Sequence, residues 1–273
     1  MPTLNHAEGE LYYDVIDLTP AWVDDPPSVL FMHGLGFDGT IWADWLPAMA
    51  ARFRLVTIDM RGCGRSSVPE AGYPWSFDGI AEDILAVSDA AGCGDRIHFV
   101  GESLGGIMGY HLAIHHPDRL HTVVSINASH QGGWIGGNVG DWDRVMQTEG
   151  IEAWSRSMME FRFGAGVISD AHYAYLDGLQ TRSARHVILE VSGELLRKMD
   201  LKPRLASIST PLLLLMGEAS PFVSVECACD IRSAVGGAAQ LHVIAGARHG
   251  VAISHSRECI GATLAFIGRH CET

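Results

Sequence analysis

A lone serine occupies a strand-to-helix transition in the segment RIHFVGESLGGIMGYHLAIHHPDRL, residues 96–120. The residues before Ser103 are apolar and partly β-branched, as in a buried strand, and those after it are apolar with helical spacing until Pro117. Residues 101–105 read GESLG, which fits the pattern G-x-S-x-G at the sharp turn where that pattern exposes a serine hydroxyl. We therefore predict that Ser103 is a nucleophile, placed where a helix N-terminus favours developing negative charge.

A serine hydroxyl needs a base to become a good nucleophile. The best candidate among the 14 histidines is His249, in the loop IAGARHGV between the last predicted strand and the last predicted helix. Such a loop can place an imidazole over the strand ends, and the order nucleophile first, histidine last occurs among known triads. Five other histidines flank Ser103 at positions typical of strands, helix surfaces and helix ends: His98, His111, His115, His116 and His121.

Short apolar runs alternate with helical patterns along most of the chain, which is typical of a parallel sheet with crossover helices. The predicted strands are 28–34, 54–62, 96–102, 121–127, 211–217 and 240–246, with an edge strand over 9–17, and the predicted helices are 40–52, 77–92, 104–116, 223–235 and 254–269.

The alternation breaks once, because more than 80 residues without a convincing strand separate residues 121–127 from residues 211–217. This is far longer than a crossover connection requires. Amphipathic helical patterns fill the gap, at 141–148, 151–162, 170–180 and 183–199. We expect residues 1–130 and 206–273 to form the core and residues 131–205 to form a helical cap over the carboxyl ends of the strands.

Four segments together resemble the α/β-hydrolase family: FMHGLGFDGTIW, TIDMRGCGRS, FVGESLGGIMGYHLAIHHPDRL and IAGARHGV. The likeness spans residues 28–127 and 205–270, and it is closest to small capped members such as 3-oxoadipate enol-lactonases, related esterases and carbon–carbon bond hydrolases. It implies an α/β-hydrolase fold, with a mostly parallel central sheet flanked by helices and an inserted helical cap.

The resemblance also implies roles for individual residues. Ser103 is the nucleophile, His249 is the general base, and the backbone N–H groups of Leu35 and Leu104 form the oxyanion hole. His33 is then expected to brace the oxyanion loop rather than to catalyse. The turn after the second strand is expected to be braced by Asp59, Arg61 and Arg65.

The triad acid departs from the family pattern. Relatives carry an aspartate in G-x-x-D-P after the strand 211–217, but residues 217–221 read GEASP, with Ser220 at the aspartate position. Ser220 or Asn127, which lies 24 residues past the nucleophile, is the first-ranked neutral partner for His249. Glu218 ranks second and a true loss of hydrolysis third. Losing the charge matters, because it costs a serine protease about 10⁴ in kcat.

Composition restricts the partners and the location of the protein. The 273-residue chain has a net charge of −13, with 47% hydrophobic residues, and shows no basic stripe, which argues against nucleic acid and anionic membranes. It shows neither a signal-peptide pattern nor an apolar run of the roughly 18–20 residues that span a bilayer, so we expect a cytoplasmic protein. The six cysteines lack zinc-site spacing, so we expect free thiols, no metal and no cofactor.

The predicted cap is rich in aromatic residues, which at helical spacing are expected mainly to fill the space between the cap and the sheet. The pocket is then mostly apolar and suits a small or medium acyl compound, with a homodimer left open. Arg144, Arg156 and Arg162 could bind a substrate carboxylate, but solvated cap surface is the expected place of each.

Three functions compete. The first is an esterase or lactonase that forms an acyl-enzyme on Ser103. The second is a carbon–carbon bond hydrolase of ring-cleavage products that uses the same residues. The third is a hydrolase-like scaffold with a ligand-binding or non-hydrolytic role. The absent aspartate favours the third, whereas the GESLG turn, the oxyanion loop and His249 favour the first two.

Overall fold

The computed structural model describes residues 2–6, 9–136 and 139–270, and one eight-stranded sheet lies at its centre. The strands are β1 (Thr3–His6), β2 (Gly9–Ile16), β3 (Ser28–Met32), β4 (Arg54–Ile58), β5 (Ile97–Glu102), β6 (Leu120–Ile126), β7 (Leu212–Gly217) and β8 (Ala239–Ile244). Their order across the sheet is β1-β2-β4-β3-β5-β6-β7-β8. All neighbours from β4 to β8 pair in parallel, whereas β1 and β2 are antiparallel additions, so the predicted mostly parallel sheet is confirmed.

The prediction of an edge strand at residues 9–17 is wrong in one respect. β2 pairs with β4 on one side and with β1 on the other, so that β1 forms the edge. β1 has the sequence TLNH and is half exposed, and no apolar pattern marks it. Backbone pairing with β2 supports it instead of burial, and short edge strands of this kind are common in natural sheets.

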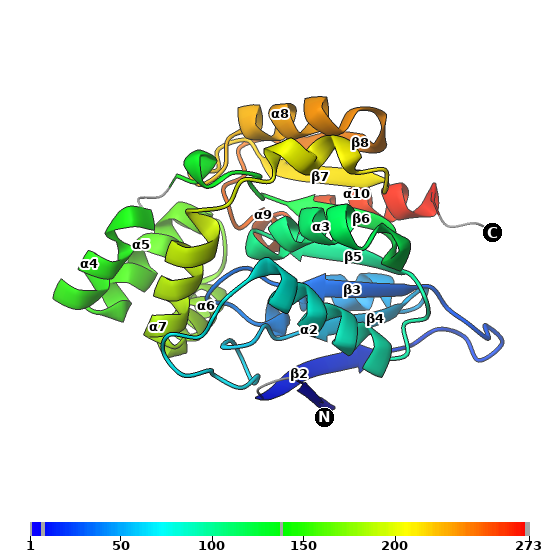
Figure 1. Cartoon of the computed structure of the whole chain (residues 1–273), viewed down its shortest axis with the longest axis horizontal. Coiled ribbons are helices and arrows are strands. Elements are labelled where there is room, and N and C mark those ends of the chain that lie inside the picture. Colours follow the sequence, from blue (N-terminus) through cyan, green and yellow to red (C-terminus); the bar gives the residue numbers. More distant parts are fainter. Residues whose placement is uncertain (1, 7–8, 137–138, 271–273) are drawn as a thin grey trace.

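Helices cover both faces of the sheet (Figure 1). One layer contains α2 (Phe77–Ala90), α3 (Leu104–His115) and α8 (Val225–Val235), and the other contains α1 (Trp45–Met49), α9 (Val251–Ser254) and α10 (Ser256–Gly268). Successive side chains of a strand point to opposite faces. In β3, Leu30 and Met32 therefore join the core under α2, α3 and α8, while Val29 and Phe31 join the core under α1 and α10.

Residues 131–205, called the insertion below, connect β6 to β7 and carry four α-helices among the described residues. These are α4 (Trp142–Thr148), α5 (Ile151–Phe163), α6 (Asp170–Arg182) and α7 (Arg185–Glu190), the last continued by a π-helical turn over Val191–Leu196. The four predicted helical patterns correspond to these elements, with 183–199 shortened at both ends. The insertion helices group together at one end of the sheet, on the left in Figure 1. None of the described helices combines the length and apolar character needed to cross a membrane.

Candidate active site

Ser103 stands between β5 and α3 in a strained backbone conformation. Its φ of 54° and ψ of −112° lie outside the regions that ordinary residues favour. The flanking glycines allow the strand and the helix to approach. A Cβ atom on Gly101 would come within 2.2 Å of the Gly105 backbone, and one on Gly105 within 2.2 Å of the Met32 carbonyl oxygen. The tight turn that the GESLG pattern predicts is therefore present, with the serine at its apex.

His249 reaches Ser103 from the loop between β8 and α9. Its Nε2 lies 3.1 Å from the Ser103 Oγ, and the histidine is 3% exposed. The ring also packs against Phe222, with 4.6 Å between the ring centroids. Burial and the nearby Arg162 guanidinium lower the pKa of His249 to about 3, so its resting form is neutral at physiological pH. A neutral imidazole at hydrogen-bond distance from a hydroxyl is suited to act as a general base.

Ser220 lies beside the second ring nitrogen of His249. Its Oγ lies 3.2 Å from Nδ1 and also accepts a hydrogen bond from the Val223 N–H at 3.3 Å. When Nε2 accepts the proton of the Ser103 hydroxyl, Nδ1 must carry the ring proton and donate it to Ser220. Ser220 can therefore orient the imidazole, but it carries no negative charge to stabilise an imidazolium.

The two other candidates for the third position lie elsewhere. Asn127, whose φ is 47°, donates through Nδ2 to the backbone carbonyl oxygens of Arg248 and His249 and accepts from the Gly217 N–H. It thus holds the backbone of the histidine loop, and its hydrogen bonds among the described residues go to backbone groups and not to the ring. Glu218 is exposed, and its carboxylate accepts from the Gly246 N–H at 2.9 Å, away from His249.

The loop after β3 carries Leu35, and its contacts support the expected role of His33. The Nδ1 of His33 donates to the Gly34 carbonyl oxygen at 2.7 Å, and its Nε2 accepts from the Met60 N–H at 2.9 Å. Leu104 is the first residue of α3, so its N–H has no partner within the helix. The two N–H groups predicted for the oxyanion hole thus belong to segments on either side of Ser103.

One expectation for the turn after β4 needs correction. Asp59 accepts from the backbone N–H groups of Gly39 and Arg65, so it does brace this turn. Arg61, by contrast, forms a two-pronged ion pair with Asp83 of α2, at 2.7 and 3.0 Å. The side chain of Arg61 therefore points toward the helix layer and not into the turn that it was expected to brace.

A small, largely apolar cavity lies above Ser103 and His249. It has a volume of about 30 Å³ and is lined by residues of the sheet side and of the insertion. The apolar lining residues are Leu35, Ile107, Ala128, Ile135, Val139, Trp142, Leu196, Phe222 and Val223. No cluster of three or more potential metal ligands occurs within the described part of the chain.

Arg162 also lines this cavity, which corrects the expectation of a solvated arginine. It is 6% exposed and projects from α5, where it shares the buried face with Trp154, Met158 and Met159. Burial lowers the pKa of Arg162 to about 10, partly opposed by the negative charge of Glu102, so the guanidinium stays charged at neutral pH.

Glu102, the residue before the nucleophile, is a buried acid that sequence reasoning missed. It is 2% exposed, and its Oε1 has no hydrogen-bond partner among the described residues. Burial raises the pKa of Glu102 to about 7, although the positive charge of Arg162 opposes the rise. Its place at the end of the predicted strand 96–102 could have indicated burial, and the structure buries all six positions of β5.

Glu102 should make stability depend on pH. Its pKa is higher in the folded protein than in the unfolded chain, so its contribution is fully present below about pH 4 and lost as pH rises through about 7. We expect Glu102→Gln to raise the free energy of unfolding at pH 8 by on the order of 3 kcal/mol relative to its effect at pH 4. Urea unfolding of both proteins at a series of pH values measures this difference. Glu82→Gln, at an exposed position of α2, is the control, and parallel pH profiles for Glu102→Gln and the natural protein would contradict the expectation.

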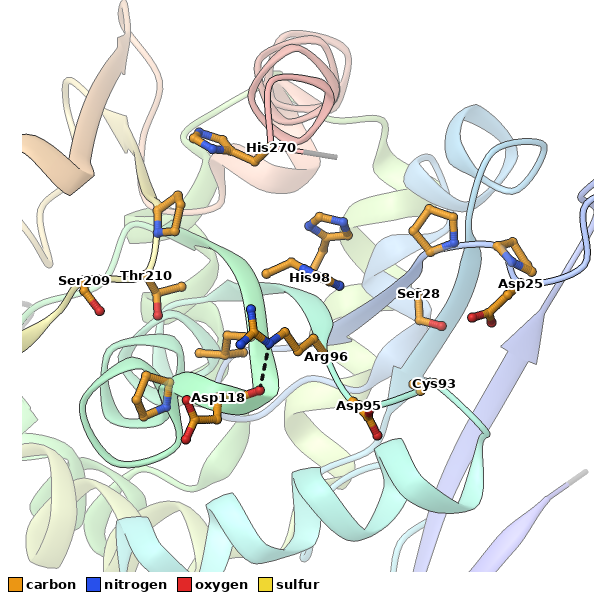
Figure 2. A pocket seen from close by; sticks show the side chains of 17 residues that line it. Asp25, Ser28, Cys93, Asp95, Arg96, His98, Asp118, Ser209, Thr210 and His270 are labelled. Carbon is orange, nitrogen blue, oxygen red and sulfur yellow. Dashed lines mark hydrogen bonds between the residues drawn. The ribbon is translucent and has the colours of Figure 1, made fainter. Parts of the chain in front are cut away.

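A larger cavity lies at the opposite ends of the strands (Figure 2). Its volume is about 810 Å³, and it is lined by residues that precede or begin β3, β5, β6 and β7. Figure 2 shows Arg96 donating to the Asp118 carbonyl oxygen beside His98, whose pKa is lowered to about 4 by burial. Ligand sites of parallel α/β sheets form at the carboxyl ends of the strands. The smaller cavity, which holds Ser103 and His249, is therefore the candidate active site.

Known proteins share this fold. Residues 27–150 match the family model described as alpha/beta hydrolase fold. A protein from Pantoea ananatis with the name "Putative carbamate hydrolase RutD" is 30% identical over 239 residues, which are 82% of this chain and 81% of that protein. Among solved structures, the enol-lactonase from Burkholderia xenovorans has a TM-score of 0.88 at 22% identity and covers 98% of this chain and 100% of its own. A hydrolase from Pseudomonas aeruginosa has a TM-score of 0.86 at 27% identity and covers 98% of each chain. Together with the eight-stranded sheet, these matches show that the chain belongs to the α/β-hydrolase family.

Proposed function

We propose that the protein is a serine hydrolase of small or medium carboxylic esters or lactones, working through an acyl-enzyme on Ser103. One observation carries the proposal: the Ser103 Oγ lies 3.1 Å from a buried, neutral His249, below a cavity with mostly apolar walls. Such walls suit the alkyl chain of an acyl group, while Ser103 and His249 would face the carbonyl carbon of the substrate. In this proposal the insertion acts as the cap, because it supplies Ile135, Trp142 and Leu196 to the cavity.

The proposed reaction has two steps. In the first, His249 Nε2 takes the proton of Ser103 as Oγ attacks the carbonyl carbon, and the N–H groups of Leu35 and Leu104 stabilise the oxyanion. The imidazolium then gives its proton to the leaving alkoxide, and the acyl group stays on Ser103. In the second step, His249 takes a proton from water, which attacks the acyl carbon. The imidazolium then gives that proton to Ser103 Oγ as the bond between Oγ and the acyl carbon breaks, which releases the acid and restores the enzyme. Ser220 orients the ring in both steps but adds no charge.

The test is a substrate panel with detection of the covalent intermediate. We expect turnover of p-nitrophenyl acetate or butyrate, or of a simple lactone, and an acyl adduct in the intact mass of acid-quenched protein. A p-nitrophenyl carbamate belongs in the panel, because one relative is named for carbamate hydrolysis. Absence of both turnover and fluorophosphonate labelling would favour the scaffold hypothesis. Turnover without an adduct, even under rapid quenching, would contradict the acyl-enzyme.

A further inference from the structure

Arg162 connects the insertion to both loops that complete the candidate site. Its Nη2 donates to the Leu35 carbonyl oxygen at 3.0 Å, in the loop that carries one proposed oxyanion donor. Its backbone carbonyl oxygen accepts from the N–H of Gly250 at 2.9 Å, next to His249. One residue of α5 therefore contacts the oxyanion loop through its side chain and the histidine loop through its backbone.

The guanidinium itself is held in a defined orientation. Its Nη1 donates to the Gln180 Oε1 on α6, and its central carbon lies 4.3 Å from the centroid of the Phe37 ring. Gln180 is fully buried and in turn donates to Ser155 of α5. A planar group with two fixed donors and a stacked ring has few alternative positions. Arg162 therefore connects α5 and α6 to the sheet as a rigid unit.

The peptide that Arg162 contacts is restrained from both sides. The N–H of Gly36 lies beside the buried Cys63 thiol, where it partly opposes the rise in pKa that burial causes, while the carbonyl oxygen of the same peptide accepts from Arg162. Gly36 has a φ of 79°, which residues with a side chain rarely adopt. Because glycine has no side chain, it also restricts the backbone of this part of the loop less than other residues would. Without Arg162, the neighbouring thiol, a weak acceptor, would be the remaining polar support of this peptide among the described residues. The Leu35 N–H, which belongs to the preceding peptide, then loses the support of its own residue's carbonyl group.

We propose that Arg162 is a positioning residue, which sets the oxyanion loop and the histidine loop in register so that the site is complete only when the insertion is seated on the sheet. This inference rests on the proposed acyl-enzyme function and adds the residue that makes it depend on the insertion. A misplaced oxyanion donor lowers kcat more than it changes substrate binding, since the charge it stabilises develops in the transition state.

The charge of Arg162 provides a second, independent readout. Among the described residues it forms no direct ion pair, and its acceptors are a carbonyl and an amide oxygen. Burial of His249 and the positive charge of Arg162 keep the pKa of His249 low. Glu102, the buried residue before Ser103, is a second titratable group beside this site, and its own titration must be separated from that of His249. Replacing Arg162 by a neutral residue should raise the pKa of His249 and move the acid limb of kcat/KM to higher pH.

The experiment compares Arg162→Met and Arg162→Lys with Arg156→Met, an exposed arginine on the same helix. Hydrolysis of p-nitrophenyl butyrate is measured from about pH 2 to 8 by brief dilution from pH 8, a range that includes the expected pKa of His249 of about 3. Fluorophosphonate titration counts the active sites. We expect kcat per active site to fall about ten- to a hundred-fold in Arg162→Met, with KM changed less than about threefold. This is less than the roughly 10²- to 10³-fold cost of losing one oxyanion donor outright, because the donor is misplaced and not removed. Arg156→Met should stay within twofold. Repeating the profiles with Glu102→Gln in each protein separates His249 from Glu102.

Arg162→Lys separates geometry from charge. It keeps a positive charge but cannot hold Leu35 and Gln180 in the same plane, so kcat should fall while the acid limb stays in place. Equal kcat per active site and equal pH profiles in all variants would overturn the proposal, even if Arg162→Met is less stable. If the natural protein neither turns over esters nor reacts with the fluorophosphonate, the proposed function fails first, and this inference fails with it for a distinguishable reason.

Discussion

Ser103→Ala is expected to lower kcat/KM on p-nitrophenyl esters by about 10⁵- to 10⁶-fold, as when the nucleophile of a serine protease is removed. The change removes the only hydroxyl that the structure places against Nε2 of His249 among the described residues. It leaves the strained turn and the cavity in place, because alanine keeps the Cβ atom and the packing around it. Covalent labelling by a fluorophosphonate, read as a mass increase of the intact protein, should disappear in the same variant.

The matched control is Ser125→Ala. Ser125 is fully buried on β6, and its hydroxyl donates to the Gly106 carbonyl oxygen at 3.1 Å, outside the candidate site. This variant should keep its kcat/KM within a few-fold even if its stability falls. Labelling that persists in Ser103→Ala would place the covalent chemistry on another residue and remove the proposed mechanism.

Ser220→Asp is expected to increase kcat on a simple ester by ten- to a hundred-fold, equivalent to about 1.4–2.7 kcal/mol of barrier. Ser220 Oγ already lies 3.2 Å from His249 Nδ1, and the Val223 N–H stands ready to donate to a carboxylate at that place. A negative charge there would stabilise the imidazolium that forms as Ser103 attacks. The about 10⁴-fold cost of losing this charge in a serine protease is an upper bound on the gain, because Ser220 already orients the ring.

Two variants accompany this measurement. Ser224→Asp adds the same charge four residues away, at the N-terminus of α8, and should leave kcat nearly unchanged. Ser220→Ala removes the acceptor of the Nδ1 proton and should lower kcat. A level or reduced rate in Ser220→Asp would contradict the interpretation of Ser220 as a neutral partner and point to a reaction that needs no charged support for the imidazolium.

Several features of the protein followed from local patterns alone. Buried strands and amphipathic helices are recognisable because each has its own period of apolar residues, and most of the predicted elements correspond to elements of the structure. The turn at Ser103 was also predictable, since only glycines at positions 101 and 105 let strand and helix pass so closely. The choice of His249 as the base followed from its place in the loop after the last predicted strand.

Other features depended on contacts between segments that are distant in the sequence. The edge strand β1 has no apolar pattern of its own and exists through pairing with β2. The choice among Ser220, Asn127 and Glu218 required the direction of each side chain, which a one-dimensional pattern does not contain. Glu218 is the charged candidate, yet its carboxylate accepts a hydrogen bond from the Gly246 N–H in the turn after β8 and makes none with the imidazole among the described residues.

Arg162 shows the same division most clearly. Its spacing from Trp154 and Met158 places it on the apolar face of α5, so its burial could have been inferred from the helical period. Its partners could not, because Leu35 and Gly250 lie 127 and 88 positions away and meet it only when the insertion packs on the sheet. Local sequence determines which residues enter a face, since periodicity is a property of one segment. Packing between segments decides what each buried charge contacts, and that contact sets its pKa and its role.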